Sequence, residues 1–194
     1  YENAEYVTAR EIFKELLQKY PNADFSKLVA IRLGDFLRDE GKEDEAIKAY
    51  QNAISSYSRE IALVGKLRIA NIQAKRPYSD EYLEALKVYQ EITNLYPETP
   101  QAEEAMLRKG LTLTQYGLFT SAIITLEEFM QKYPLNIYVK RNLIQENIDE
   151  NLKGLIDLHF REGDYFALVS AYNDYKAKYL FNFRFDTTLF QTAT

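Results

Sequence analysis

Apolar residues recur at steps of three and four along most of the chain, which is the spacing of one face of an α-helix. The segment 42–57 shows the pattern clearly, with Ala46 and Tyr50 on its apolar face. The segments 26–40 and 99–116 show it as well. Nearly every segment between turn signals follows this period, so the sequence predicts helix over roughly 70% or more of the residues, against about one third in ordinary proteins.

The apolar pattern itself repeats along the chain. An alanine is followed four positions later by a bulky residue and seven positions after that by a tyrosine. The four copies are Ala9, Phe13 and Tyr20; Ala46, Tyr50 and Tyr57; Ala85, Tyr89 and Tyr96; and Ala122, Leu126 and Tyr133. The closing tyrosines lie 37 to 39 residues apart, and proline follows three of them. Self-similarity at this period predicts a solenoid built from pairs of helices.

Glycines lie inside two of the predicted helices, where each costs about 1 kcal/mol relative to alanine. Gly34 and Gly110 both precede the alanine of their unit by twelve residues. This predicts that the two helices of a unit cross closely there, so that the bulky residue reaches into the neighbouring unit. Gly65 precedes its alanine by twenty residues. We therefore expect an eight-residue insertion in the third unit, a surface loop over 74–81.

The spacing of these small residues, bulky residues and exit prolines resembles the tetratricopeptide repeat. The resemblance implies an all-α fold, a right-handed α-α superhelical solenoid of helix pairs. The expected repeats lie near 1–21, 26–58, 59–97, 99–134 and 135–180, in a single solenoid fragment over 1–194. In the fifth repeat we expect one long helix over 135–162. The segment 181–194 is expected to start a further, truncated unit.

Composition narrows the range of functions. The net charge is −5 and both signs are interspersed, which argues against nucleic acid as the partner. Cysteine is absent and His159 is the only histidine, so we expect no metal site, no cofactor and no catalytic residues. No apolar run approaches 18 residues, so no transmembrane segment is expected. The sequence thus predicts a protein that is not an enzyme.

The resemblance implies that the first helices of successive units line a concave groove for a peptide or helix. We predict that the groove is centred on the residues that directly follow the mid-helix glycines, together with residues within a turn or two. The predicted partner-binding residues are Ile31, Asp35, Arg38, Lys66, Ile69, Gln73, Arg108, Leu111 and Gln115. Tyr78 and Tyr82, in or beside the expected insertion, form a second candidate surface.

These features predict a protein-interaction scaffold that binds a protein or peptide partner. The alternative is a regulatory or substrate-docking domain of a larger enzyme. The tyrosine-proline exits and the alanine-rich helices that follow resemble tetratricopeptide proteins of the bacterial cell envelope. That resemblance favours a periplasmic or envelope-associated setting over the cytoplasm. Both ends of the solenoid are expected to expose apolar surface, through which the chain could self-associate.

Overall fold

The computed structural model describes residues 2–55, 58–76 and 80–178, and within this part of the chain all regular structure is helical. Helices make up 83% of the described residues, which confirms the predicted all-α fold. The helices are α1 (Glu2–Lys19), α2 (Asp24–Asp39), α3 (Glu43–Ile54), α4 (Arg59–Gln73), α5 (Glu81–Leu95), α6 (Pro100–Gln115), α7 (Phe119–Lys132), α8 (Ile137–Lys140), α9 (Leu143–Glu162) and α10 (Tyr165–Lys178). The expected further unit at 181–194 lies outside the described residues.

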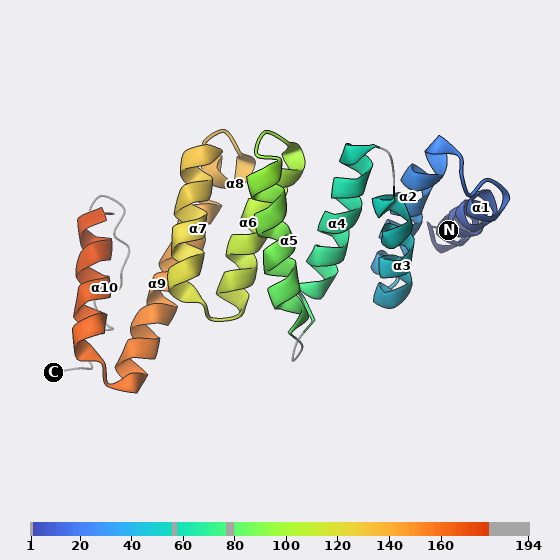
Figure 1. The fold of residues 1–194 in the computed structure, drawn as a ribbon. Helices are drawn as coiled ribbons and strands as arrows, with labels where there is room; N and C mark the ends of the chain where they lie inside the picture. Colours follow the sequence, from blue (N-terminus) through green and yellow to red (C-terminus); the bar gives the residue numbers. More distant parts are fainter. Residues whose placement is uncertain (1, 56–57, 77–79, 179–194) are drawn as a thin grey trace.

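The helices form one elongated row, with the N-terminus at one end and α10 near the other (Figure 1). Helices α1 to α7 each pack against the next, and α9 packs against both α7 and α10. In addition, α4 contacts α2 on one side and α6 on the other. The first helices of three successive pairs therefore lie along one face of the molecule, in an arrangement consistent with a tetratricopeptide solenoid.

Local sequence accounts for the helix ends. The Thr99 side chain accepts a hydrogen bond of 3.2 Å from the Ala102 backbone N–H, and Pro100 occupies the first turn of α6, where its missing N–H is not needed. Gly41 and Gly117 have φ values of +77° and +71° directly after α2 and α6. This left-handed conformation favours glycine, and it reverses the chain into the second helix of each pair.

Two pairs are closed by a bulky side chain seated on a glycine. Tyr50 and Leu126 are fully buried. A Cβ atom built on Gly34 would lie 2.6 Å from Tyr50 Cδ1, and one built on Gly110 would lie 2.9 Å from Leu126 Cγ. The predicted close crossing is thus present, but each bulky side chain occupies the glycine of its own pair. The same side chains also belong to core clusters with residues of the next pair, Ile72 for Tyr50 and Ile148 for Leu126, in agreement with the expected reach into the neighbouring unit.

The buried apolar residues divide into three clusters along the row. One cluster lies between α1 and α4, a second between α4 and α6, and a third between α6 and α10. No single centre organises the core. Each cluster is shared by neighbouring helix pairs, as expected for an array in which stability comes from contacts between adjacent units.

The expected long helix over 135–162 is interrupted. Helix α8 ends at Lys140 and α9 begins at Leu143. Between them, Asn142 adopts a left-handed conformation with φ of 61°, which asparagine tolerates better than most residues. Its carbonyl accepts from the Glu146 N–H and so starts α9. The predicted end of this helix at Gly163, with φ of 73°, is confirmed.

The expected insertion in the third unit is much shorter than eight residues. Residues 74–80 separate α4 from α5, whereas residues 40–42 and 116–118 make the corresponding connections, a difference of four residues. Gly65 misled the comparison because it serves a different contact. A Cβ there would lie 3.1 Å from the Tyr50 carbonyl oxygen, so Gly65 allows α4 to approach α3 of the preceding pair. Ala74 is also buried in the core, not part of a surface loop.

Candidate functional site

A cleft of about 420 Å³ opens on the face formed by α2, α4 and α6. Its walls carry charged and polar side chains from these three helices, and its apolar lining includes Ile72 and Leu111. Four of the nine predicted partner-binding residues line it: Arg38, Arg108, Leu111 and Gln115. The cleft therefore lies where first helices of successive pairs meet, the location that the repeat pattern predicts for a groove.

Asp35 of α2 organises one side of the cleft. Its Oδ1 accepts a hydrogen bond of 2.8 Å from the Tyr50 hydroxyl and one of 3.1 Å from Arg38 Nη1. Arg68 Nε of α4 lies 3.4 Å from the same oxygen as an ion pair. One carboxylate oxygen thus contacts two guanidinium groups and a buried phenol.

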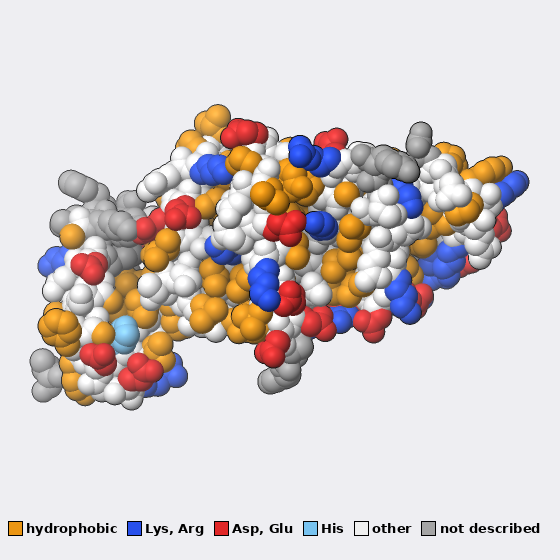
Figure 2. All heavy atoms as spheres, viewed as in Figure 1, with side chains coloured by type: hydrophobic (Ala, Val, Ile, Leu, Met, Phe, Trp, Pro, Cys, Tyr) orange, Lys and Arg blue, Asp and Glu red, His pale blue; other side chains and the backbone are white. Residues whose placement is uncertain are grey.

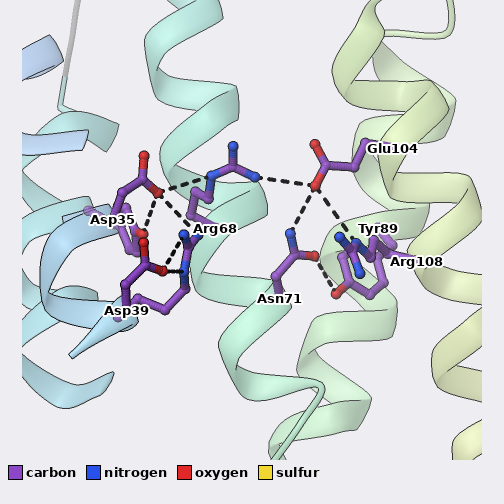
Figure 3. A network of polar contacts seen from close by, with 9 residues as sticks. Asp35, Asp39, Arg68, Asn71, Tyr89, Glu104 and Arg108 are labelled. Atoms are coloured by element: carbon purple, nitrogen blue, oxygen red, sulfur yellow. Dashed lines mark hydrogen bonds and ion pairs between the residues drawn. The ribbon is translucent and has the colours of Figure 1, made fainter. Parts of the chain in front are cut away.

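Glu104 of α6 plays the corresponding part on the other side. Its Oε1 lies 3.3 Å from Arg68 Nη1 and accepts a hydrogen bond of 3.1 Å from the Asn71 amide. Arg108 Nε, one turn along α6, lies 3.8 Å from this oxygen. Figure 3 shows Arg68 between Asp35 and Glu104, so that it links the three helices in a continuous polar network.

Two buried tyrosines donate hydrogen bonds to residues of this network. The Tyr50 hydroxyl donates to Asp35, and the Tyr89 hydroxyl donates to Asn71 Oδ1 over 2.8 Å. Burial raises the pKa of Tyr50 well above its usual value, and the hydrogen bond to Asp35 raises that pKa further. Burial also raises the pKa of Tyr89. Because an unpartnered phenol is costly inside a protein, Asp35 and Asn71 serve the packing of their own helix pairs.

The other predicted site residues are placed differently. Ile31 is only 5% exposed and belongs to the core, so it offers no surface to a partner. Ile69 is half-buried against the same core cluster, and Gln73 is half-buried in the last turn of α4. Lys66 forms an ion pair of 2.8 Å with Glu91 of α5 and does not line the cleft. Its predicted place beside Asp35 and Leu111 is wrong, because it was derived from the unrelated glycine at position 65.

Sequence reasoning missed three central residues: Arg68, Asn71 and Glu104. A signal for Asn71 was present in the repeat. Tyr50 finds its partner Asp35 fifteen residues earlier, and Tyr89 finds Asn71 eighteen residues earlier. A buried tyrosine hydroxyl requires a polar partner, so a search of α4 for one facing Tyr89 would have found Asn71. No local pattern points to Arg68 or to the contacts of Glu104 with α4, because these contacts join different helices.

The second candidate surface is only partly described. Tyr78 lies outside the described residues. Tyr82 stacks on Tyr116, with ring centroids 3.8 Å apart and planes at 10° to each other. The Tyr116 hydroxyl in turn donates to the Arg76 carbonyl over 3.0 Å. Tyr82 is therefore engaged in joining the α4–α5 connection to α6, and it is not the free contact that its position beside a loop suggests.

Outside the cleft, the described residues hold neither a metal-binding group nor a membrane-spanning helix. Among the described residues, no three histidine or acidic side chains cluster so as to hold a metal ion. None of the described helices is long and apolar enough to cross a membrane. Positive and negative side chains alternate over the face shown in Figure 2, with hydrophobic patches between them. The exclusion of nucleic acid and the self-association through the ends stay predictions.

Comparison with known families found one match, to the tetratricopeptide repeat, over residues 1–23. The match covers α1 and the whole connection over 20–23 that leads to α2. A separate comparison with curated proteins found no match. The family match and the row of helix pairs together support a tetratricopeptide repeat fold, and such repeats generally mediate protein–protein interaction.

Proposed function

We propose that the chain is a protein-interaction scaffold that binds a peptide or helix of a partner protein in the cleft between α2, α4 and α6. The observation that carries the proposal is the cleft itself, since it is formed where three first helices meet and offers both apolar and polar groups. Ligand sites typically combine an apolar lining with a few polar groups that fix orientation. Among the described residues, no three histidine or acidic side chains gather there to hold a metal ion.

The side chains of the cleft separate into two groups. Arg38 and Arg68 already have partners within the fold, and Arg68 holds the helices together. Arg108 and Gln115 are exposed on the cleft side of α6. Contacts that a partner can replace without breaking the fold are therefore concentrated on α6, and this helix should contribute most to binding.

Site-specific photo-crosslinking tests the proposal in cells that make the protein naturally. A photoreactive amino acid at Gln115 should form covalent adducts with one specific protein, and identification of the crosslinked peptide would name the segment bound. The matched control is Lys87 on α5, whose side chain is 71% exposed and lies outside the cleft. Adducts from Lys87 but not from Gln115 would contradict binding in the cleft.

The proposal includes a setting in a bacterial envelope assembly, in the periplasm or at the envelope. Its support is the resemblance of the tyrosine-proline exits to those of envelope proteins, while the cysteine-free sequence fits either a reducing cytoplasm or the envelope. Fractionation of the native cells with an antibody against the chain tests this part separately. Recovery in the cytoplasmic fraction would contradict it and would leave the cleft proposal intact.

A further inference from the structure

The walls of the cleft between α2, α4 and α6 are unequal in charge. Four cationic side chains line it, and the only lining carboxylate is that of Glu43. The cationic residues are Arg38, Arg68, Lys75 and Arg108. The carboxylates of Asp35 and Glu104, which lie next to these cations, do not line the cleft. A ligand in the cleft therefore faces mainly positive groups.

Two of the four cations are committed to the fold. Arg38 donates to Asp35 over 3.1 Å and to Asp39 over 2.8 Å. Arg68 is held between Asp35 and Glu104. Side chains held in this way would lose an existing ion pair on meeting a ligand, and the paired carboxylates largely offset their charge, so they are not expected to bind the ligand directly.

The other two cations are available. Arg108 is 46% exposed, and its closest carboxylate is Glu104 at 3.8 Å, beyond hydrogen-bonding distance. That carboxylate already accepts from Arg68 and Asn71. Lys75, just after α4, is exposed and forms no ion pair within the described ranges 2–55, 58–76 and 80–178. These two side chains bring unused donors to the cleft from two different helix pairs.

The apolar lining lies close to these cations in the same cleft. Leu111 is on α6 one turn from Arg108 and is half-buried. Ile72 and Ala74, near the end of α4, line the cleft but are only 2% and 5% exposed, so Leu111 offers the main apolar surface. A segment that fits must therefore present carboxylate and apolar side chains side by side. Charge-assisted hydrogen bonds to carboxylates are stronger than neutral ones, which favours glutamate or aspartate over their amides.

We propose that the cleft selects an acidic peptide segment of a partner protein, in which glutamate or aspartate side chains alternate with apolar ones, through Arg108 and Lys75. The inference rests on the proposed function and adds the chemistry of the partner. It concerns internal acidic side chains, so a free chain terminus is not required.

The test uses two synthetic peptides labelled with an uncharged dye and capped at both ends. One has the sequence Ser-Gly-Leu-Glu-Leu-Glu-Leu-Gly-Ser, and in the other glutamine replaces both glutamates. Fluorescence anisotropy with the full chain should show at least about tenfold tighter binding of the glutamate peptide, a difference that decreases as salt rises. Equal binding of both peptides, or no saturable binding of the glutamate peptide up to about 1 mM, would overturn the inference.

Variants locate the preference. Arg108→Gln combined with Lys75→Gln should remove the preference for glutamate. The matched control is Lys48→Gln combined with Lys153→Gln, which changes the net charge equally at two exposed positions away from the cleft and should keep it. Retention of the preference in the cleft variant would overturn the assignment. Circular dichroism confirms that each variant keeps its helices.

Charge reversal gives a second, positive readout. Arg108→Glu with Lys75→Glu should reverse the preference toward a peptide in which lysine replaces glutamate. Inorganic phosphate at equal ionic strength should compete no better than chloride; strong competition by phosphate would point to a free anion site and overturn the peptide assignment. If crosslinking from Gln115 succeeds but the glutamate preference is absent, the chemistry proposed here fails while the binding function stands.

Discussion

In the pairs α2–α3 and α6–α7 a bulky side chain packs against a glycine, but the residues that surround this contact differ. In both, the bulky residue sixteen positions after a glycine lies against that glycine, with Tyr50 on Gly34 and Leu126 on Gly110. The residue after the glycine is Asp35 in the first pair and Leu111 in the second. Asp35 accepts the tyrosine hydroxyl, whereas leucine has no polar atom to satisfy.

The difference shows that the same repeat position can support the packing of one helix pair and line the cleft in another. In α2 the position after the glycine must be polar, because it receives a buried phenol. In α6 the same position carries Leu111, which lines the cleft. Asp35 was predicted as a partner-binding residue because it directly follows a mid-helix glycine, and the hydrogen bond to Tyr50 shows that packing uses it.

Removing the bulky residue should have the largest effect. Tyr50→Ala should lower the free energy of unfolding by about 4 kcal/mol and Leu126→Ala by about 3 kcal/mol, because both side chains are fully buried and the tyrosine leaves the larger cavity. Urea denaturation followed by circular dichroism measures both. A loss under about 0.5 kcal/mol for either, the range of surface substitutions, would show that the seat is not part of the core.

Replacing Gly34 and Gly110 by alanine should reveal a clearer difference in stability between the two pairs. Gly34→Ala places a Cβ against a stiff ring, and we expect a net loss of about 2 kcal/mol. Gly110→Ala meets a leucine that can change rotamer, and alanine improves helix propensity by about 1 kcal/mol, so its loss should be about 1 kcal/mol or less. Thermal and urea melts of both variants test this. Equal losses would show that ring stiffness does not decide the outcome.

The hydrogen bond that distinguishes the pairs can be measured by a double-mutant cycle. Tyr50→Phe should cost about 1 kcal/mol, and the coupling between Tyr50→Phe and Asp35→Ala should be of similar size. The same cycle for Tyr89→Phe and Asn71→Ala serves as an internal reference, since that hydroxyl also donates over 2.8 Å. A coupling near zero in both cycles would show that the hydroxyl contacts contribute nothing net to stability.

The smallest expected effect is a dependence on alkaline pH. Because the folded pKa of Tyr50 is raised above the usual value of 10, its contribution to stability is complete well below pH 10 and declines as pH rises. At pH 10 half of the unfolded tyrosine is ionised, which costs about 0.4 kcal/mol relative to pH 8. Tyr50→Phe should abolish this share of the pH dependence in urea melts, and Leu126→Ala should keep it. If wild type and Tyr50→Phe show the same dependence of unfolding free energy on pH, the conclusion that the Tyr50 pKa is raised by burial is wrong.

Most of the fold could be predicted from sequence because its determinants are local. Helix period, the tyrosine-proline exits and the glycine sixteen positions before a bulky residue all act within one helix pair. The predictions failed where the local sequence was compatible with two different structural roles for one residue. Gly65 lies inside a predicted helix as Gly34 does, but its contact is with the preceding pair. Asn142 stands in a segment with continuous helical periodicity, yet it takes a left-handed conformation and divides it.

The sequence by itself determined the helices and their repetition, because hydrophobic periodicity and glycine spacing depend on neighbouring positions. Only the tertiary structure decided which side chains meet across three helices. Arg68 joins Asp35 and Glu104 from positions 33 and 36 residues away, and Arg108 is left exposed because Glu104 is already shared. Ion pairs between helices depend on crossing geometry and on competition for one carboxylate, and neither leaves a periodic trace in the sequence.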